Sequence, residues 1–126
     1  MNNQSKFSDE QPKLSPFHER QAELNIRDAW SVWNGYKFAD YYYEAEYEYF
    51  CIRNTCGTYD ISPMQKYLIE GKNAESMLNR MVTRDISNLK INRVTYVLWC
   101  TNEGRVIDDG TIFKLDAEKF MLTCGS

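Results

Sequence analysis

The sequence lacks several features that would assign it to common classes of protein. It has three prolines and a single histidine, His18, and no stretch approaches the ~18 consecutive apolar residues of a membrane span. Residues 1–12 are polar and lack the apolar segment of a secretory signal. These absences argue against a membrane-spanning or exported protein, so the expected location is the cytoplasm.

No large excess of either charge is present. Fifteen Lys and Arg residues stand against 18 Asp and Glu residues, which gives a formal net charge of -3. A chain of this kind has no long-range attraction to a phosphate backbone or to anionic lipid. We therefore expect neither nucleic acid nor a membrane among its partners.

The four cysteines, Cys51, Cys56, Cys100 and Cys124, form no CxxC pair and are too few for a dense disulfide framework. They predict reduced, partly buried thiols and no metal site. His18 alone could serve a Ser/His or Cys/His catalytic pair. Its place at the start of a predicted helix favours a surface role instead.

The chain is rich in aromatic residues. They make up 14% of the chain, and many of them lie between Trp30 and Tyr59. Such a cluster suits a core, an interface or a ring-binding pocket, and composition does not choose among these.

The first half of the chain mixes weak and clear signals. Residues 1–14 are polar and without periodicity, which predicts a flexible arm. Residues 15–24 fit a helix capped by Ser15, whereas 30–43 are expected to be loop-like. The spacing of apolar residues over 44–56 predicts a helix ending near Gly57, followed by a β-prone run at 58–62.

The second half has clearer periodicity. Residues 66–71 favour a strand, and Met77, Leu78, Met81 and Val82 give residues 73–83 the apolar stripe of a helix that packs on a sheet. Further strands are expected at 93–101, 105–115 and 119–123. This order predicts the α+β class, with a ferredoxin-like antiparallel sheet and packed helices. Because the chain stops directly after a strand, we expect the fold to be incomplete.

Five segments, in order, resemble the glycine cleavage T-protein, or aminomethyltransferase, family. Their order and spacing carry more weight than any one of them. They are residues 59–64 (YDISPM), 69–74 (IEGKNA), 83–86 (TRDI), 96–100 (YVLWC) and 104–109 (GRVIDD). In addition, Glu48 and Arg53 match a Glu and an Arg of the family's N-terminal helix. The resemblance implies an N-terminal fragment of such a protein.

The resemblance also implies a domain organisation and a function. Residues 15–62 would be the N-terminal segment of the first T-protein-like domain, and 63–126 most of the ferredoxin-like second domain, truncated at its C-terminal end. The function implied is a tetrahydrofolate-dependent one-carbon (aminomethyl) transferase. Its partners would be folate, a small amine or methyl donor, and a lipoyl carrier protein.

The family's site residues transfer to four positions. Asp109 would be the catalytic acidic group that orients the reacting folate amine, and Met64, Tyr96 and Phe113 would join it in binding folate. Neighbouring strand residues point to opposite faces, so Asp108 and Asp109 cannot both reach one pocket. Tyr96 shares the face of Asp109 only if the intervening hairpin has a two-residue turn or a bulge.

Departures from the family pattern leave alternatives open. Pro63, Gln65 and Cys124 replace residues usual in glycine-cleavage members, which favours a different donor. The alternatives are a folate-dependent demethylase of an S- or O-methyl substrate and a non-catalytic folate-binding protein of the same fold. We expect the fragment alone to be inactive and to form a homo-oligomer through its exposed edges or its aromatic region.

Overall fold

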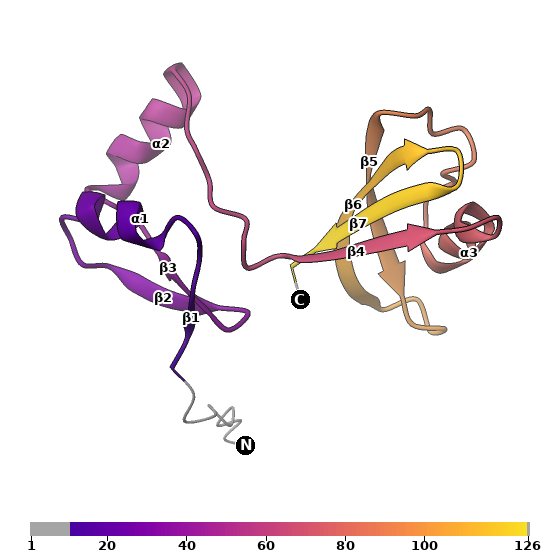
Figure 1. The fold of residues 1–126 in the computed structure, drawn as a ribbon, viewed down its shortest axis with the longest axis horizontal. Helices are drawn as coiled ribbons and strands as arrows, with labels where there is room; N and C mark the ends of the chain where they lie inside the picture. The colour runs from indigo at the N-terminus through magenta and orange to yellow at the C-terminus, as the bar shows by residue number, and fades with distance from the viewer. Residues whose placement is uncertain (1–10, 126) are drawn as a thin grey trace. The chain divides into compact units, whose positions relative to one another are not determined.

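The computed structural model describes residues 11–125 and divides into two compact units, Met1–Pro63 and Met64–Ser126 (Figure 1). We refer to them as unit 1 and unit 2. Residues 1–10 of the predicted arm lie outside the described residues. None of the helices within residues 11–125 is long and apolar enough to cross a membrane.

Unit 1 contains a small sheet with the strand order β1-β3-β2. Strands β2 (Trp30–Trp33) and β3 (Tyr36–Ala39) form an antiparallel hairpin, so the loop expected at 30–43 is wrong for residues 30–39. Asn34 and Gly35 connect them with φ of 49° and 78°. Two consecutive positive φ values are typical of the type I′ turn that Asn-Gly favours.

The last two residues of the predicted arm form strand β1 (Lys13–Leu14) instead. This strand pairs in parallel with β3, and the Lys13 amide donates a 2.8 Å hydrogen bond to the Gly35 carbonyl. The hairpin has a free edge there, which offers hydrogen-bonding groups to a polar segment that has no periodicity of its own.

Helix α1 (His18–Leu24) begins later than predicted. The Ser15 carbonyl accepts from the His18 amide and its Oγ accepts from the Phe17 amide at 3.2 Å, which makes a turn before the helix. Helix α2 (Ala45–Asn54) confirms the second predicted helix. Its last residue is Asn54 and its C-cap is Thr55, two residues before the predicted glycine cap.

The predicted strand at 58–62 is absent from the structure. Asp60 explains this difference, because its carboxylate accepts hydrogen bonds from the Ser62 amide at 2.9 Å and from the Gln21 side chain at 2.8 Å. An Asp that bonds the backbone two residues on stabilises a turn rather than a sheet ladder.

Unit 2 is an antiparallel sheet with one helix, α3 (Ala74–Met81), as the sequence predicts. The strand order is β4-β7-β6-β5, and a tight turn joins the last two strands of the chain. The α+β class is confirmed. The strands are β4 (Gln65–Glu70), β5 (Arg93–Cys100), β6 (Val106–Asp116) and β7 (Lys119–Cys124).

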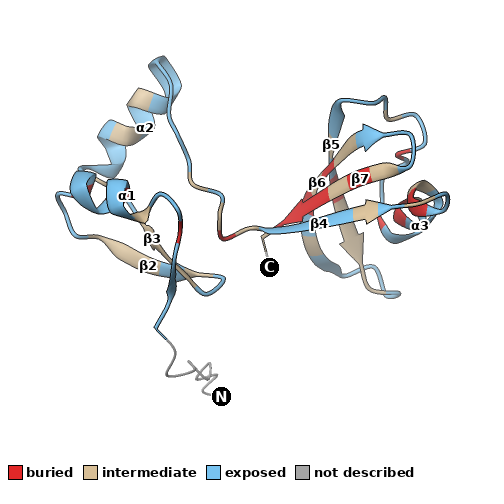
Figure 2. Ribbon diagram, in the orientation of Figure 1, coloured by how far each residue is buried: buried red, intermediate tan, exposed pale blue. Residues whose placement is uncertain are grey.

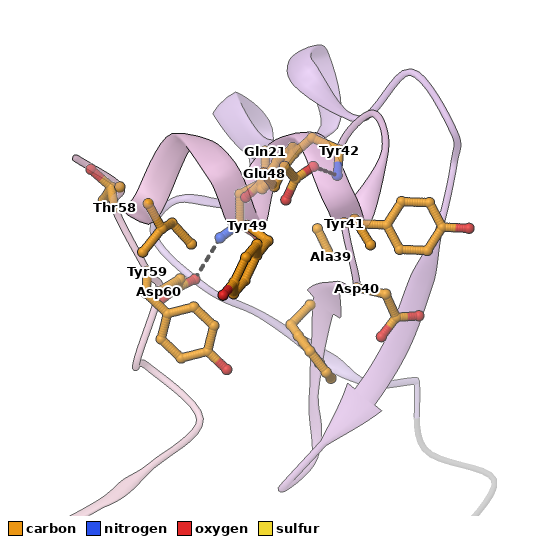
Figure 3. A pocket seen from close by; sticks show the side chains of 14 residues that line it. Gln21, Ala39, Asp40, Tyr41, Tyr42, Glu48, Tyr49, Thr58, Tyr59 and Asp60 are labelled. Atoms are coloured by element: carbon orange, nitrogen blue, oxygen red, sulfur yellow. Dashed lines mark hydrogen bonds between the residues drawn. The ribbon is translucent and has the colours of Figure 1, made fainter. Parts of the chain in front are cut away.

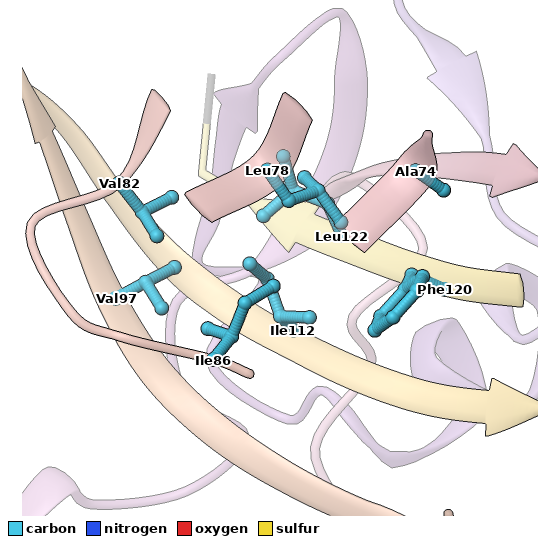
Figure 4. Close-up of a cluster of buried hydrophobic side chains, with 8 residues drawn as sticks. All are labelled: Ala74, Leu78, Val82, Ile86, Val97, Ile112, Phe120 and Leu122. Atoms are coloured by element: carbon cyan, nitrogen blue, oxygen red, sulfur yellow. The ribbon is translucent and has the colours of Figure 1, made fainter. Parts of the chain in front are cut away.

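The apolar core lies between α3 and one face of this sheet (Figure 4). Alternation along the strands sends every second side chain toward the helix. The buried cluster consists of Ala74, Leu78, Val82, Ile86, Val97, Ile112, Phe120 and Leu122. Among residues 64–125, no second helix covers the opposite face of the sheet, which we call the open face.

Burial is unequal between the two units (Figure 2). In the described part of unit 1, no Leu, Ile, Val, Phe, Tyr or Trp is buried. Helix α2 buries none of its residues, and Ile52 on it is 64% exposed. Apolar burial thus stabilises unit 2 far more than unit 1.

Candidate functional site

The hairpin between β5 and β6 determines which side chains share the open face. Its loop closes with the Thr101 amide donating to the Arg105 carbonyl at 2.8 Å, and Gly104 in it has a φ of 79°. The pairing then shifts from Cys100 opposite Val106 to Trp99 opposite Asp108. Ile107 is therefore an extra residue, which makes a β-bulge.

This bulge places Tyr96 directly opposite Thr111, on the same face as Asp109. The Tyr96 hydroxyl donates a 2.7 Å hydrogen bond to Asp109 Oδ2. The prediction that either a short turn or a bulge unites these two side chains is confirmed, with the bulge as the device. Asp108 pairs with Trp99 and belongs to the opposite face, as predicted.

The hydrogen bond to Asp109 raises the pKa of Tyr96 above 10.0, with smaller contributions from desolvation and from the charges of Asp109 and Asp108. Tyr96 therefore keeps its proton at neutral pH and remains a donor. With a donor at Oδ2, the carboxylate of Asp109 is held in one orientation and retains Oδ1 as an acceptor.

Phe113 lies on the same face, two residues beyond Thr111 on β6. Val94 is opposite it on β5 and Met121 opposite it on β7, so an apolar row crosses the sheet beside the Tyr96–Asp109 pair. Tyr96 is 53% exposed.

Met64 lies in a bend immediately before β4, outside the ladder. Gln65, the first residue of β4, pairs with Cys124, which in turn pairs with Gly110. Met64 precedes Gln65 just as Asp109 precedes Gly110, and β4 and β6 run in the same direction. Met64 therefore belongs to the same end of the sheet as Asp109.

Two further features of the open face were not predicted from the sequence. Leu98 lies opposite Asp109 in the β5–β6 ladder. Thr111 and Thr123 join their hydroxyls at 2.6 Å beside Tyr96. Both depend on the register of the β5–β6 hairpin, which can be assigned only when the position of the bulge is known.

The part of the open face around Tyr96 thus combines the Asp109 carboxylate, aromatic and apolar walls and a fixed phenol donor. This set of groups fits a flat heterocycle whose edge carries N–H donors. It does not resemble a metal centre: within residues 11–125, no group of three or more His, Cys, Asp or Glu side chains is arranged to hold a metal ion.

Comparisons with known proteins agree with this architecture. The family model described as "GCVT N-terminal domain" matches residues 17–126. An aminomethyltransferase from Halothermothrix orenii is 31% identical over 110 residues, which cover 87% of this chain and 30% of that protein. A trimethylamine-oxide aldolase from Ruegeria pomeroyi is 31% identical over 123 residues, which cover 94% of this chain and 15% of that protein.

A solved structure supports the same fold. The crystal structure of glycine cleavage system aminomethyltransferase T from Bartonella henselae superposes with a TM-score of 0.74 at 22% sequence identity. The match covers 90% of this chain and 31% of that one. The chain therefore spans less than a third of the length of these relatives.

Proposed function

The chain belongs to the GCVT N-terminal domain family, and on that premise we propose that it supplies the Asp109-bearing part of a tetrahydrofolate-dependent one-carbon (aminomethyl) transferase. The observation that carries the proposal is the 2.7 Å hydrogen bond from Tyr96 to Asp109 on the open face of the unit 2 sheet. It holds a carboxylate in a fixed orientation beside exposed rings.

Asp109 is the catalytic residue of this proposal. Its carboxylate accepts a hydrogen bond from a nitrogen of the folate, which orients the lone pair of that nitrogen toward the incoming carbon. Tetrahydrofolate, when bound, would supply the amine nitrogens that receive the one-carbon unit. Tyr96 acts through Asp109 by occupying Oδ2, so that Oδ1 remains for the ligand.

Met64, Tyr96 and Phe113 form the proposed walls for the ring system. Aromatic faces and a thioether suit a flat, polarisable ligand. Since Tyr96 is half exposed, we expect the isolated chain to bind folate weakly and to show no turnover of its own.

The one-carbon donor is a separate question. An aminomethyl group on a lipoyl carrier protein is the donor suggested by the aminomethyltransferase relatives. The relative named trimethylamine-oxide aldolase matches more of the chain, 94% against 87%, and favours a small methylated compound as a second candidate. A screen of both donor types with tetrahydrofolate in the intact enzyme would separate these candidates.

The role of Asp109 is tested by Asp109→Asn in the intact enzyme. We expect kcat to fall by about 100-fold or more, the usual order for loss of a positioned acid–base group. The matched control is Asp116→Asn, which makes the same change at the far end of β6, and we expect its kcat to stay near wild type. Unchanged turnover in Asp109→Asn would remove Asp109 from the mechanism, whatever its effect on folate binding measured by calorimetry.

A further inference from the structure

The open face carries few positive charges. Strands β4 to β7 contain four Lys and Arg residues, and alternation along the strands places two of them, Lys66 and Lys119, on this face. Lys119 is opposite Glu70 in the β4–β7 ladder, and its Nζ lies 3.3 Å from Glu70 Oε2. The charge of Lys119 is therefore balanced within the face.

Lys66 lies in the same cross-strand row as Tyr96. It pairs with Thr123, Thr123 pairs with Thr111, and Thr111 pairs with Tyr96. Residues directly opposite one another in antiparallel strands share a face, so the row runs across all the strands of the sheet. Three strand spacings of about 4.8 Å separate the backbones of Tyr96 and Lys66 by about 14 Å.

Uncharged side chains occupy the interval between these two residues. The Thr111 and Thr123 hydroxyls bond to each other at 2.6 Å. The next row of the open face is apolar and consists of Val94, Phe113, Met121 and Leu68. A ligand that extends from Asp109 toward β4 therefore meets a carboxylate and a phenol first, then apolar and hydroxyl groups, and an ammonium group last.

Tetrahydrofolate has groups that match this order. Its pterin edge carries N–H donors, a benzoyl ring follows, and a glutamate tail carries carboxylates at the far end. A tail carboxylate near Lys66 gains an opposite charge, and the attraction grows where water is partly displaced. Lys66 also interacts within the chain, and its three N–H donors allow a ligand carboxylate to share the ammonium group.

The pocket in unit 1 is unsuited to such a tail. It has a volume of about 430 Å³ and is formed by the end of β3, by α2 and by residues 58–60 (Figure 3). Asp40, Glu48 and Asp60 are among the residues that line it, and no Lys or Arg is among them. Three carboxylates repel an anionic ligand. Of these two surfaces, the open face is the one that offers a folate tail an opposite charge.

We propose that Lys66 is a specificity-determining residue that binds a carboxylate of the folate glutamate tail. The pterin then lies at Asp109 and Tyr96, and the tail crosses the sheet from β5 and β6 toward β4. This assignment rests on the proposed function and deepens it, because it gives the ligand a direction and its anionic end a position.

The test compares tetrahydrofolate with its dimethyl ester, in which both tail carboxylates are neutral and the rings are unchanged. Calorimetry on the intact enzyme measures the two affinities. We expect the wild type to bind the acid about fivefold more tightly than the ester, the order of one exposed ion pair.

Three variants locate the interaction. In Lys66→Gln the preference for the acid over the ester should disappear, and in Lys66→Arg, which keeps the charge, it should remain. Lys119→Gln is the matched control, because it makes the same change at the cation that Glu70 already balances, and it should keep the preference.

The proposal is overturned if the wild type binds acid and ester equally, if Lys66→Gln retains the preference, or if Lys119→Gln loses it to the same extent. In these cases the transferase function still stands, provided that the wild type binds tetrahydrofolate and Asp109→Asn loses turnover. If the wild type binds neither compound, both fail. Partial misfolding of Lys66→Gln would lower the bound fraction for both compounds and leave the ratio of their affinities unchanged.

Discussion

Gly110 lies where the neighbouring strand leaves no room for a side chain. A Cβ at this position would stand 2.2 Å from the Thr123 carbonyl oxygen and 3.2 Å from its carbon. Both atoms are backbone, so neither can move without disturbing the β6–β7 ladder. Gly110 directly follows Asp109 and thereby fixes the strand position of the proposed catalytic carboxylate.

We predict that Gly110→Ala lowers the free energy of unfolding by at least about 3 kcal/mol, the upper end of the usual cost of overpacking. Gly125→Ala is the matched control, because a Cβ there would meet nothing within 4 Å. Urea unfolding of both variants provides the measurement. Equal midpoints for the two would show that the ladder yields to the added carbon.

The charge of Asp60 should make the stability of unit 1 depend on pH. Its partial burial acts to raise the pKa, but hydrogen bonds from Ser15, Ser62 and Gln21 outweigh this and hold the pKa below 3.8. A carboxyl whose folded pKa is lowered stabilises the fold above the unfolded pKa and loses that contribution as the pH falls through the folded pKa.

We therefore predict that Asp60→Asn destabilises unit 1 at neutral pH and that its difference from wild type shrinks below pH 3.8. Unfolding followed by NMR signals of unit 1 would measure this. A difference that stayed constant across the whole pH range would mean that the charge of Asp60 contributes nothing.

At the level of elements, α3 shows how burial follows from spacing. Leu78 is 0% exposed between the helix and the sheet, whereas Met77, one residue earlier, is 44% exposed. Lys114 of β6 reaches Glu75 of this helix at 2.6 Å and adds an ion pair at its first turn.

We expect Leu78→Ala to destabilise unit 2 by about 2–5 kcal/mol, because the residues around it cannot fully collapse into the cavity. Met77→Ala removes a side chain of similar size from the exposed side of α3 and should cost much less. Thermal unfolding of the pair gives the comparison, and similar losses for both would contradict the assigned face of the helix.

Elements with a clear period were predictable from the sequence, and those that depend on side-chain hydrogen bonds were not. The apolar stripe of α3 and the alternation of side chains along β5, β6 and β7 predict directly which side of each element faces the core. The β2–β3 hairpin was missed although Asn34-Gly35 is a strong turn signal, because its strands are short and aromatic on both faces. Residues 58–62 have strand propensity, but the Asp60 carboxylate accepts hydrogen bonds from the Gln21 side chain and the Ser62 amide, which stabilise a turn instead.

The candidate site, too, was only partly predictable from the sequence. Alternation along one strand assigned Asp109 and Phe113 to the same face, but Tyr96 could be added only on the condition of a two-residue turn or a bulge. The roles of all three in folate binding stay predictions. The hydrogen bond between Gln21 and Asp60 in unit 1 could not be foreseen, because it joins residues 39 positions apart, which no local pattern encodes.

At the level of the whole molecule, much apolar surface is uncovered. The open face exposes Val94 and Leu68, the sheet ends in the edge strands β4 and β5, and α2 exposes Phe50 and Ile52. Surfaces and strand edges of this kind promote association with another copy.

We predict that the chain forms a dimer or a larger assembly, to be measured by multi-angle light scattering over a range of concentrations. Val94→Lys places a charge on the edge strand β5 and should shift the population toward monomer. A wild-type monomer at high concentration would contradict the prediction.

The bulge at Ile107 has a consequence for how the length of this hairpin can vary. Deleting Ile107 would remove the bulge and leave Tyr96 opposite Thr111. A change in the number of loop residues between Thr101 and Arg105 would also leave this pairing intact. Deleting Leu98 would instead bring Tyr96 opposite Gly110 and send it to the face away from Asp109. Insertions and deletions between the bulge and the loop therefore keep Tyr96 and Asp109 on one face. A single insertion or deletion between the bulge and Tyr96 would move the two side chains to opposite faces.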